Sequence, residues 1–99
     1  MTIEITDFDP AEYLDDDEAI AEYLSDAMES QDQAVIADAL GVVARAKGMP
    51  ALADETGLSR ESLYKSLSPK GNPELGTVLK VMKAFGQKMA ATPVSNHAH

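Results

Sequence analysis

The 99-residue sequence contains no cysteine and no tryptophan, and the first of these absences narrows its chemistry. Without cysteine there is neither a disulfide framework nor a thiolate metal site, so a reducing cytoplasm is the expected compartment. The amino terminus is acidic and lacks the basic segment and apolar run of a signal peptide. The longest uncharged apolar stretch, residues 39–44, is too short to cross a bilayer. We therefore expect a cytoplasmic protein without a membrane segment.

Catalytic and metal-binding constellations are also missing. The two histidines, His97 and His99, stand in the carboxyl-terminal tail, where a frayed end is favoured over a weak metal pair. The consecutive acids at residues 15–17 lack the ligand spacing and the glycine of a calcium loop. No glycine-rich phosphate loop follows a convincing strand. The sequence therefore predicts a protein that is not an enzyme and that carries no cofactor and no metal.

What the sequence has in excess is acid, and this acid is unevenly distributed. The formal net charge is −9. Residues 1–44 hold thirteen acids and no Lys or Arg, a charge of −13, whereas residues 45–99 hold eight bases and four acids, a charge of +4. The basic segment 45–99, which can attract phosphate groups, is thus joined to the acidic segment 1–44, which repels them. The alternative for the acidic part alone is a solvated helix face.

Apolar residues recur at three- and four-residue spacing, which predicts an all-α fold of about five short helices. A turn-forming run at residues 68–73 separates the last two helices. We expect the apolar face of the last helix to be buried. That face consists of Leu75, Val78, Leu79, Met82 and Phe85. The expected helices cover about residues 18–29, 33–47, 50–56, 60–67 and 74–85.

The chain ends carry weaker signals. Residues 1–9 alternate loosely and suit an extended arm, and residues 95–99 suit a frayed tail. Residues 89–94 suit either a short strand or coil. By function we divide the chain into an acidic amino-terminal arm (1–30), a DNA-binding domain (31–88) and a carboxyl-terminal tail (89–99).

Residues 49–67, MPALADETGLSRESLYKSL, meet three demands of a helix-turn-helix. Ala53 is the small residue that the first helix needs where the second packs on it. Gly57 suits a turn with positive φ, and Ser59 suits the cap of the second helix, with its hydroxyl on the amide of residue 61 or 62. Together these features predict a DNA-binding helix-turn-helix, and an ordinary helical hairpin is the alternative. The residues expected on its inward side are Leu52, Leu58, Leu63 and Leu67.

The second helix of this motif is expected to present its polar side to a major groove. Arg60 is the candidate for a base edge, because a guanidinium can bond guanine O6 and N7 together. Glu61 is either an acceptor for a cytosine amino group or a solvated residue that keeps Arg60 extended. Tyr64 is either a contact to a thymine methyl or phosphate, or a partly buried aromatic. The lysines are expected phosphate partners. The predicted DNA-binding residues are Ser59, Arg60, Glu61, Tyr64, Lys65, Lys70 and Lys47.

The stretch at residues 53–73, ADETGLSRESLYKSLSPKGNP, closely resembles the bacterial addiction-module antidote proteins, antitoxins of the HigA/Xre-like class. The resemblance extends to FDPAEYLDDD at 8–17, AIAEYL at 19–24, ARAKGM at 44–49 and TVLKVMKAFG at 77–86. It implies an Xre-type, lambda-repressor-like fold around the helix-turn-helix. It also implies binding to the protein's own promoter and neutralisation of a small RelE/HigB-like toxin encoded beside it.

The resemblance gives the acidic arm a role. Toxins of that kind are basic because they act on mRNA at the ribosome, so an acidic helix is an expected electrostatic partner. For Ile20, Tyr23 and Leu24 the alternative is packing in the core, which is favoured for an apolar stripe. The candidate toxin contacts are Tyr13, Leu14, Asp15, Asp16, Asp17, Glu18, Ile20, Tyr23 and Leu24.

Two positions depart from the pattern of that class. Ser66 stands where its recognition helices often place an apolar residue, so that Leu67 must supply this contact. Gly76 lies inside the last expected helix. Both features bear on individual contacts more than on the fold.

The sequence as a whole predicts the antitoxin of a type II toxin–antitoxin module, a homodimer that represses its own operon at a palindromic operator. The first alternative is a stand-alone helix-turn-helix regulator whose acidic arm folds back over its basic part. The second is a protein-interaction module without DNA contact.

Overall fold

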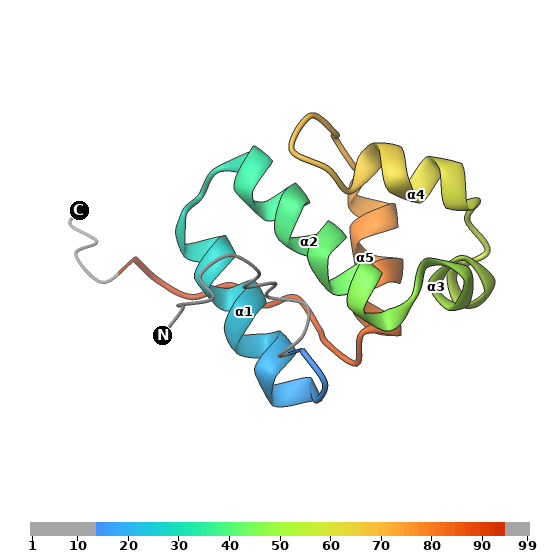
Figure 1. Ribbon diagram of the computed structural model, residues 1–99. Helices are drawn as coiled ribbons and strands as arrows, with labels where there is room; N and C mark the ends of the chain where they lie inside the picture. The colour runs from blue at the N-terminus through green and yellow to red at the C-terminus, as the bar shows by residue number, and fades with distance from the viewer. Residues whose placement is uncertain (1–13, 95–99) are drawn as a thin grey trace, which may run out of the picture.

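A computed structural model describes residues 14–94 and shows five α-helices joined by short connections (Figure 1). Each expected helix is present, with ends within one residue of those predicted. Residues 14–94 contain no β-strand, which confirms the all-α prediction for this part of the chain. The predictions for residues 1–9, Tyr13 and residues 95–99 lie outside the described residues. The helices are α1 (Asp17–Glu29), α2 (Gln33–Lys47), α3 (Met49–Thr56), α4 (Arg60–Ser66) and α5 (Leu75–Ala84).

Local capping explains where the first two helices begin. The side chain of Asp16 accepts a hydrogen bond of 2.7 Å from the amide of Ala19 and so caps α1. Asp32 caps α2 in the same way, accepting from the amides of residues 34 and 35. Helix starts leave amide groups without backbone partners, and a carboxylate there satisfies them and suits the helix dipole. Gly48, at φ 102°, separates α2 from α3.

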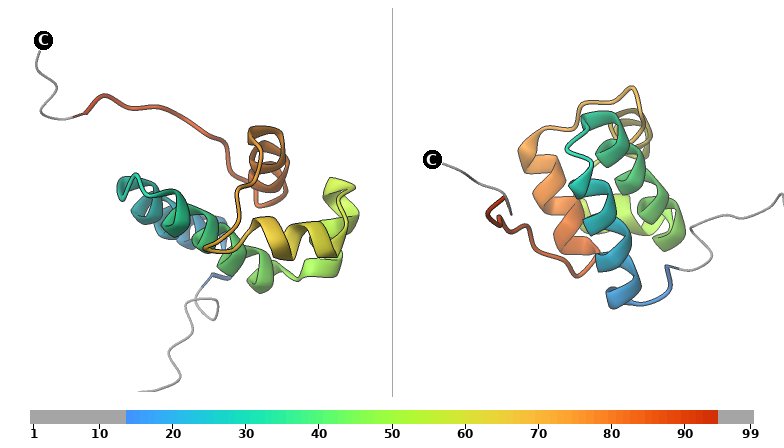
Figure 2. Two further views of the ribbon diagram at one scale, coloured as in Figure 1. Left: turned by 90° about the horizontal axis from the view of Figure 1, so that it is seen from above. Right: turned by 90° about the vertical axis from the view of Figure 1, so that its left-hand side faces the viewer.

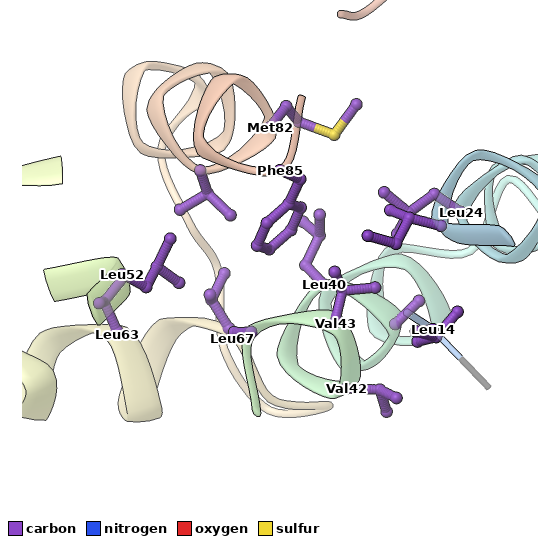
Figure 3. Close-up of a cluster of buried hydrophobic side chains, with 14 of the residues drawn as sticks. Leu14, Leu24, Leu40, Val42, Val43, Leu52, Leu63, Leu67, Met82 and Phe85 are labelled. Atoms are coloured by element: carbon purple, nitrogen blue, oxygen red, sulfur yellow. The ribbon is translucent and has the colours of Figure 1, made fainter. Parts of the chain in front are cut away.

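The core lies where all five helices meet. Phe85, at the end of α5, is fully buried and points between Leu24 of α1 and Leu52 of α3 (Figure 3). Leu40 and Val43 of α2 complete the centre of this cluster. α1 packs against α2, whereas α5 packs against α3 (Figure 1). The described part of the acidic arm is therefore part of the same core as the rest of the chain.

The prediction of one buried face on α5 is only partly right. Of the predicted residues, Val78, Met82 and Phe85 face inward, together with Val81, which was not predicted. Leu75 is 64% exposed and Leu79 is 48% exposed. Successive residues of a helix are rotated by about 100°, so Leu75 and Leu79 lie one turn apart on the flank of the buried line. α5 thus carries an apolar surface that no other described residue covers.

Residues 87–94 contain no strand, and the coil alternative for residues 89–94 is the correct one. A strand needs a partner for its backbone groups, and the described residues offer none. Instead, the segment that follows α5 runs beside α1, with the Gln87 amide group donating to the carbonyl of Asp17 at 2.9 Å. None of the described helices is both long and apolar enough to cross a bilayer.

Candidate nucleic-acid interface

The connection between α3 and α4 is a three-residue turn held by local hydrogen bonds. Gly57 has φ 76° and ψ 10°, the left-handed conformation that glycine adopts at little cost, and its amide donates to the carbonyl of Ala53 at 2.9 Å. The Thr56 hydroxyl donates to the carbonyl of Leu52 at 2.8 Å and accepts from the amide of Leu58 at 3.2 Å. Gly57 takes the predicted role, whereas the part played by Thr56 was not predicted.

Ser59 begins α4 as its cap. Its hydroxyl oxygen accepts a hydrogen bond of 3.0 Å from the amide of Ser62, and its backbone is extended at φ −75° and ψ 152°. The predicted cap is confirmed, with residue 62 as the donor. The cap therefore fixes the residue at which α4 begins.

The inward side of α4 is anchored in the core. Leu63 of α4 and Leu67, which directly follows it, are buried beside Leu52 of α3 (Figure 3). Leu58 is half-buried against the same cluster. Leu67 supplies the apolar contact that Ser66 does not, as expected, and the Ser66 hydroxyl donates instead to the carbonyl of residue 62 at 2.9 Å.

Gly41 is a positioning residue that the sequence analysis missed. A Cβ atom at this position in the middle of α2 would collide with the backbone carbonyl oxygen of Leu67. The end of α4 therefore approaches α2 so closely that only glycine fits. The available signal was the glycine itself, since glycine inside a helix costs about 1 kcal/mol relative to alanine and needs a reason.

The outer side of α4 is open to solvent and polar. All five predicted contacts in this region are exposed, and Tyr64, at 55%, is not the partly buried aromatic of the alternative. A shallow hollow on this surface is lined by the side chains of Ser59, Glu61, Ser62, Tyr64 and Lys65. We call the exposed surface formed by residues 59, 60, 61, 64 and 65 the α4 outer face.

The two remaining predicted lysines lie on other segments. Lys70 is exposed on the turn that follows α4, where the Gly71 amide donates to the carbonyl of Ser68 at 2.8 Å. Lys47 is the last residue of α2, and the whole of α3 separates it from α4 in the chain. The structure therefore places five of the seven predicted DNA contacts on α4 and its cap, and leaves Lys70 on the following turn and Lys47 at the end of α2.

The α4 outer face has the dimensions and chemistry of a groove-binding surface. An α-helix with its side chains is about 10–12 Å across, and a B-DNA major groove is about 12 Å wide, so a short helix such as α4 fits into it. The α4 outer face offers one guanidinium, one ammonium group, one carboxylate and two hydroxyl groups, which are hydrogen-bonding groups for base edges and phosphates. Nowhere in residues 14–94 do three or more His, Cys, Asp or Glu side chains gather in a way that could hold a metal ion.

The predicted toxin contacts fall into two groups. Asp15, Asp16, Asp17 and Glu18 are exposed at the start of α1, where Asp16 is also the cap. The apolar members Leu14, Ile20 and Leu24 are buried in the core, and Tyr23 is half-buried against it. The alternative of packing in the core therefore describes Leu14, Ile20 and Leu24, because little of their side-chain surface stays exposed. Tyr13 lies outside the described residues.

The acidic helix α1 does not cover α4, which carries the predicted DNA contacts. α1 lies on α2 at the end of the molecule away from α4 (Figures 1 and 2). The α4 outer face is exposed. The alternative of an autoinhibitory arm requires the acidic segment to fold back over the α4 outer face. Within residues 14–94 it does not do so.

Comparison with known proteins identifies relatives of the chain over most of its length. A family model described as "Probable addiction module antidote protein" matches residues 4–93. A protein of Haemophilus influenzae (strain Rd), described as uncharacterized, is 48% identical over 85 residues, which are 86% of this chain and 88% of that protein. No solved structure matches the chain.

Proposed function

The chain belongs to the family of probable addiction module antidote proteins, and on that premise we propose that it is the antitoxin of a type II toxin–antitoxin module. In this proposal it neutralises a RelE/HigB-like toxin by direct binding. It also binds operator DNA upstream of its own gene and represses that operon from the cytoplasm. Family membership carries the antitoxin assignment, and the exposed α4 outer face supports the DNA-binding part.

The α4 outer face is the DNA-reading surface in this proposal. Arg60 contacts a guanine in the major groove, and Glu61 and Tyr64 lie beside it for further base or phosphate contacts. Lys65 and Lys70 neutralise phosphates on either side and supply affinity without sequence information. The acidic α1 suits this arrangement because it lies away from α4 and does not repel the DNA at close range (Figure 1).

Binding to a palindromic operator requires two copies, and we place their contact on the exposed flank of α5. In the sequence Gly76 lies between the exposed Leu75 and Leu79, and, apart from its chain neighbours and the backbone of its own helix, no described atom lies within 4 Å of the place where its Cβ would be. A helical glycine that no neighbour within the chain requires suits the close approach of a second molecule, because it has no side chain in the way. In an antiparallel pairing about residue 77, Leu75 of one copy meets Leu79 of the other.

Leu79→Glu should therefore weaken homodimerisation by about 10-fold or more, because it places a charge in an apolar contact. The side chain is 48% exposed in the single chain, so the fold itself should persist. Sedimentation equilibrium over a range of concentrations measures the effect. The matched control is Val35→Glu, an equally exposed apolar residue of α2, which should leave the dimer unchanged. A wild-type chain that stays monomeric at every concentration would exclude this dimer.

The antitoxin assignment is tested with the product of the open reading frame next to this gene. Induced alone in a bacterial host, that product should arrest growth, and co-expression of the full chain should restore it. The two purified proteins should co-elute as one complex. If the neighbouring product is harmless, or stays toxic in the presence of the chain, the antitoxin proposal is wrong and the stand-alone regulator is favoured.

A further inference from the structure

A groove of about 310 Å³ lies between α1 and the segment at residues 87–92. Its apolar lining comes from Leu24 and Met28 of α1, Met82 of α5 and Met89 of the carboxyl-terminal segment. Met89 is 43% exposed although it lines an apolar surface. Methionine side chains are flexible and polarisable, and they adapt to the shape of an apolar partner side chain. The lining therefore suits insertion of a long apolar side chain from another molecule.

The outer wall of the groove begins at a residue that is hydrogen-bonded to both neighbouring helices. At Gly86, φ is 76°, and the chain turns there from α5 towards α1. The Gln87 backbone amide donates to the carbonyl of Met82 at 2.9 Å, and its side-chain amide group donates to the carbonyl of Asp17 at 2.9 Å. Gln87, the first residue of this wall, is thus tied to α5 and to the start of α1.

The surface beside the groove is strongly acidic. α1 contains five acids and no Lys or Arg, and all five are exposed. Glu29 lines the groove itself, and Lys88 on the opposite wall is the one cation of the lining. Opposite charges at the edge of an interface attract the partner and set its orientation. An anionic molecule such as nucleic acid is therefore disfavoured here, and a cationic partner is favoured. The acids of α1 are Asp17, Glu18, Glu22, Asp26 and Glu29.

We propose that this groove is the docking site for the toxin, occupied by a cationic segment that inserts one long apolar side chain between Met28 and Met89. The inference rests on the proposed antitoxin function and assigns that function a surface. In place of Ile20, which is buried in the core, it takes Met28 and Met89 as the accessible apolar contacts, and the nearly buried Leu24 remains only as part of the groove lining. The exposed acids of α1 attract and orient the segment, and the methionines hold its apolar side chain.

Two substitutions in the full chain separate the charged and the apolar parts of this site. Glu29→Lys reverses a charge at the end of α1, where a cation also suits the helix dipole, so the fold should tolerate it. Met89→Asp removes an apolar wall residue outside any helix while adding a further acid. The matched control is Glu55→Lys, the same reversal of an exposed acid in the last turn of α3.

The probe is the purified product of the neighbouring open reading frame, and its affinity for each variant is measured by calorimetry. Glu29→Lys and Met89→Asp should each weaken binding by about 10-fold or more, which corresponds to about 1.4 kcal/mol, and Glu55→Lys should change it by less than about twofold. Unchanged DNA binding by the two groove variants would show that they are folded.

The other outcomes are distinguishable. If the wild-type chain binds the probe and both groove variants bind equally well, the groove is not the docking site, whereas the antitoxin function stands. If only Glu29→Lys weakens binding, the contact is electrostatic and no side chain occupies the groove, which also overturns the proposal. If the groove variants lose the homodimer, the groove binds a second copy instead. If the wild-type chain does not bind the probe, the proposed function fails and the docking site fails with it.

Discussion

Replacing Arg60 by alanine should weaken binding to the DNA upstream of the chain's own gene by about 1–3 kcal/mol, or roughly 5- to 150-fold. Arg60 is the first residue of α4 and is exposed on the α4 outer face. The expected loss of binding free energy is this large because the guanidinium would donate two parallel hydrogen bonds to guanine, and an alanine side chain can donate none. The cap made by Ser59 uses a different side chain, so α4 itself should remain formed. Fluorescence anisotropy at several salt concentrations measures the effect.

Two further variants separate base recognition from general attraction. Arg45→Ala removes an exposed arginine from the last turn of α2 and should reduce affinity far less. Lys65→Ala should weaken binding to operator and random DNA alike and lower the slope of log affinity against log salt by about one. If Arg60→Ala binds as the wild type does, α4 is not the reading helix. Wild-type binding to the upstream DNA no tighter than to random DNA would favour the protein-interaction module.

Replacing Phe85 by alanine should lower the free energy of unfolding by about 3–5 kcal/mol. The ring is fully buried where α1, α2, α3 and α5 meet, so its removal leaves a cavity that no single helix can fill by moving (Figure 3). A small domain has a total stability of about 5–15 kcal/mol, so this loss is a large part of it. Urea denaturation followed by circular dichroism at 222 nm measures the change.

The control for Phe85 is Leu75→Ala on the same helix. Leu75 is 64% exposed, and its truncation should change the unfolding free energy of the single chain by no more than about 0.5 kcal/mol. The measurement is made at a concentration low enough to exclude dimer. If both variants lost a similar amount of unfolding free energy, both side chains would have to point into the core. The sequence pattern predicted that arrangement, and the observed packing of α5 would then be wrong.

The secondary structure of residues 14–94 was readable from the sequence because its determinants are local. Caps at Asp32 and Ser59, the left-handed glycine at Gly57 and apolar residues at helical spacing each act over a few neighbouring residues. The helix ends were accordingly predicted within one residue. The α4 outer face was predictable for the same reason, since a cap and a buried leucine fix which side of a short helix points outward.

The sequence also carried the family relationship and the opposite charges of the two halves. For Ile20 and Leu24 the sequence allowed two roles, packing in the core or contact with a partner protein. The spacing of apolar residues does not distinguish these two roles. The acidic arm remains a functional prediction, whereas in packing α1 belongs to the core that it shares with α2.

Other features were decided only by the tertiary structure, because they depend on residues far apart in the chain. The side of α5 that is buried is set by α3 and by the rest of the core, which leave Leu75 and Leu79 exposed. Gly41 is required because the end of α4 approaches α2, and the groove exists because residues 87–92 return to lie beside α1. A sequence pattern specifies which residues can share a helix face, but the neighbours that cover that face are fixed only when the chain folds.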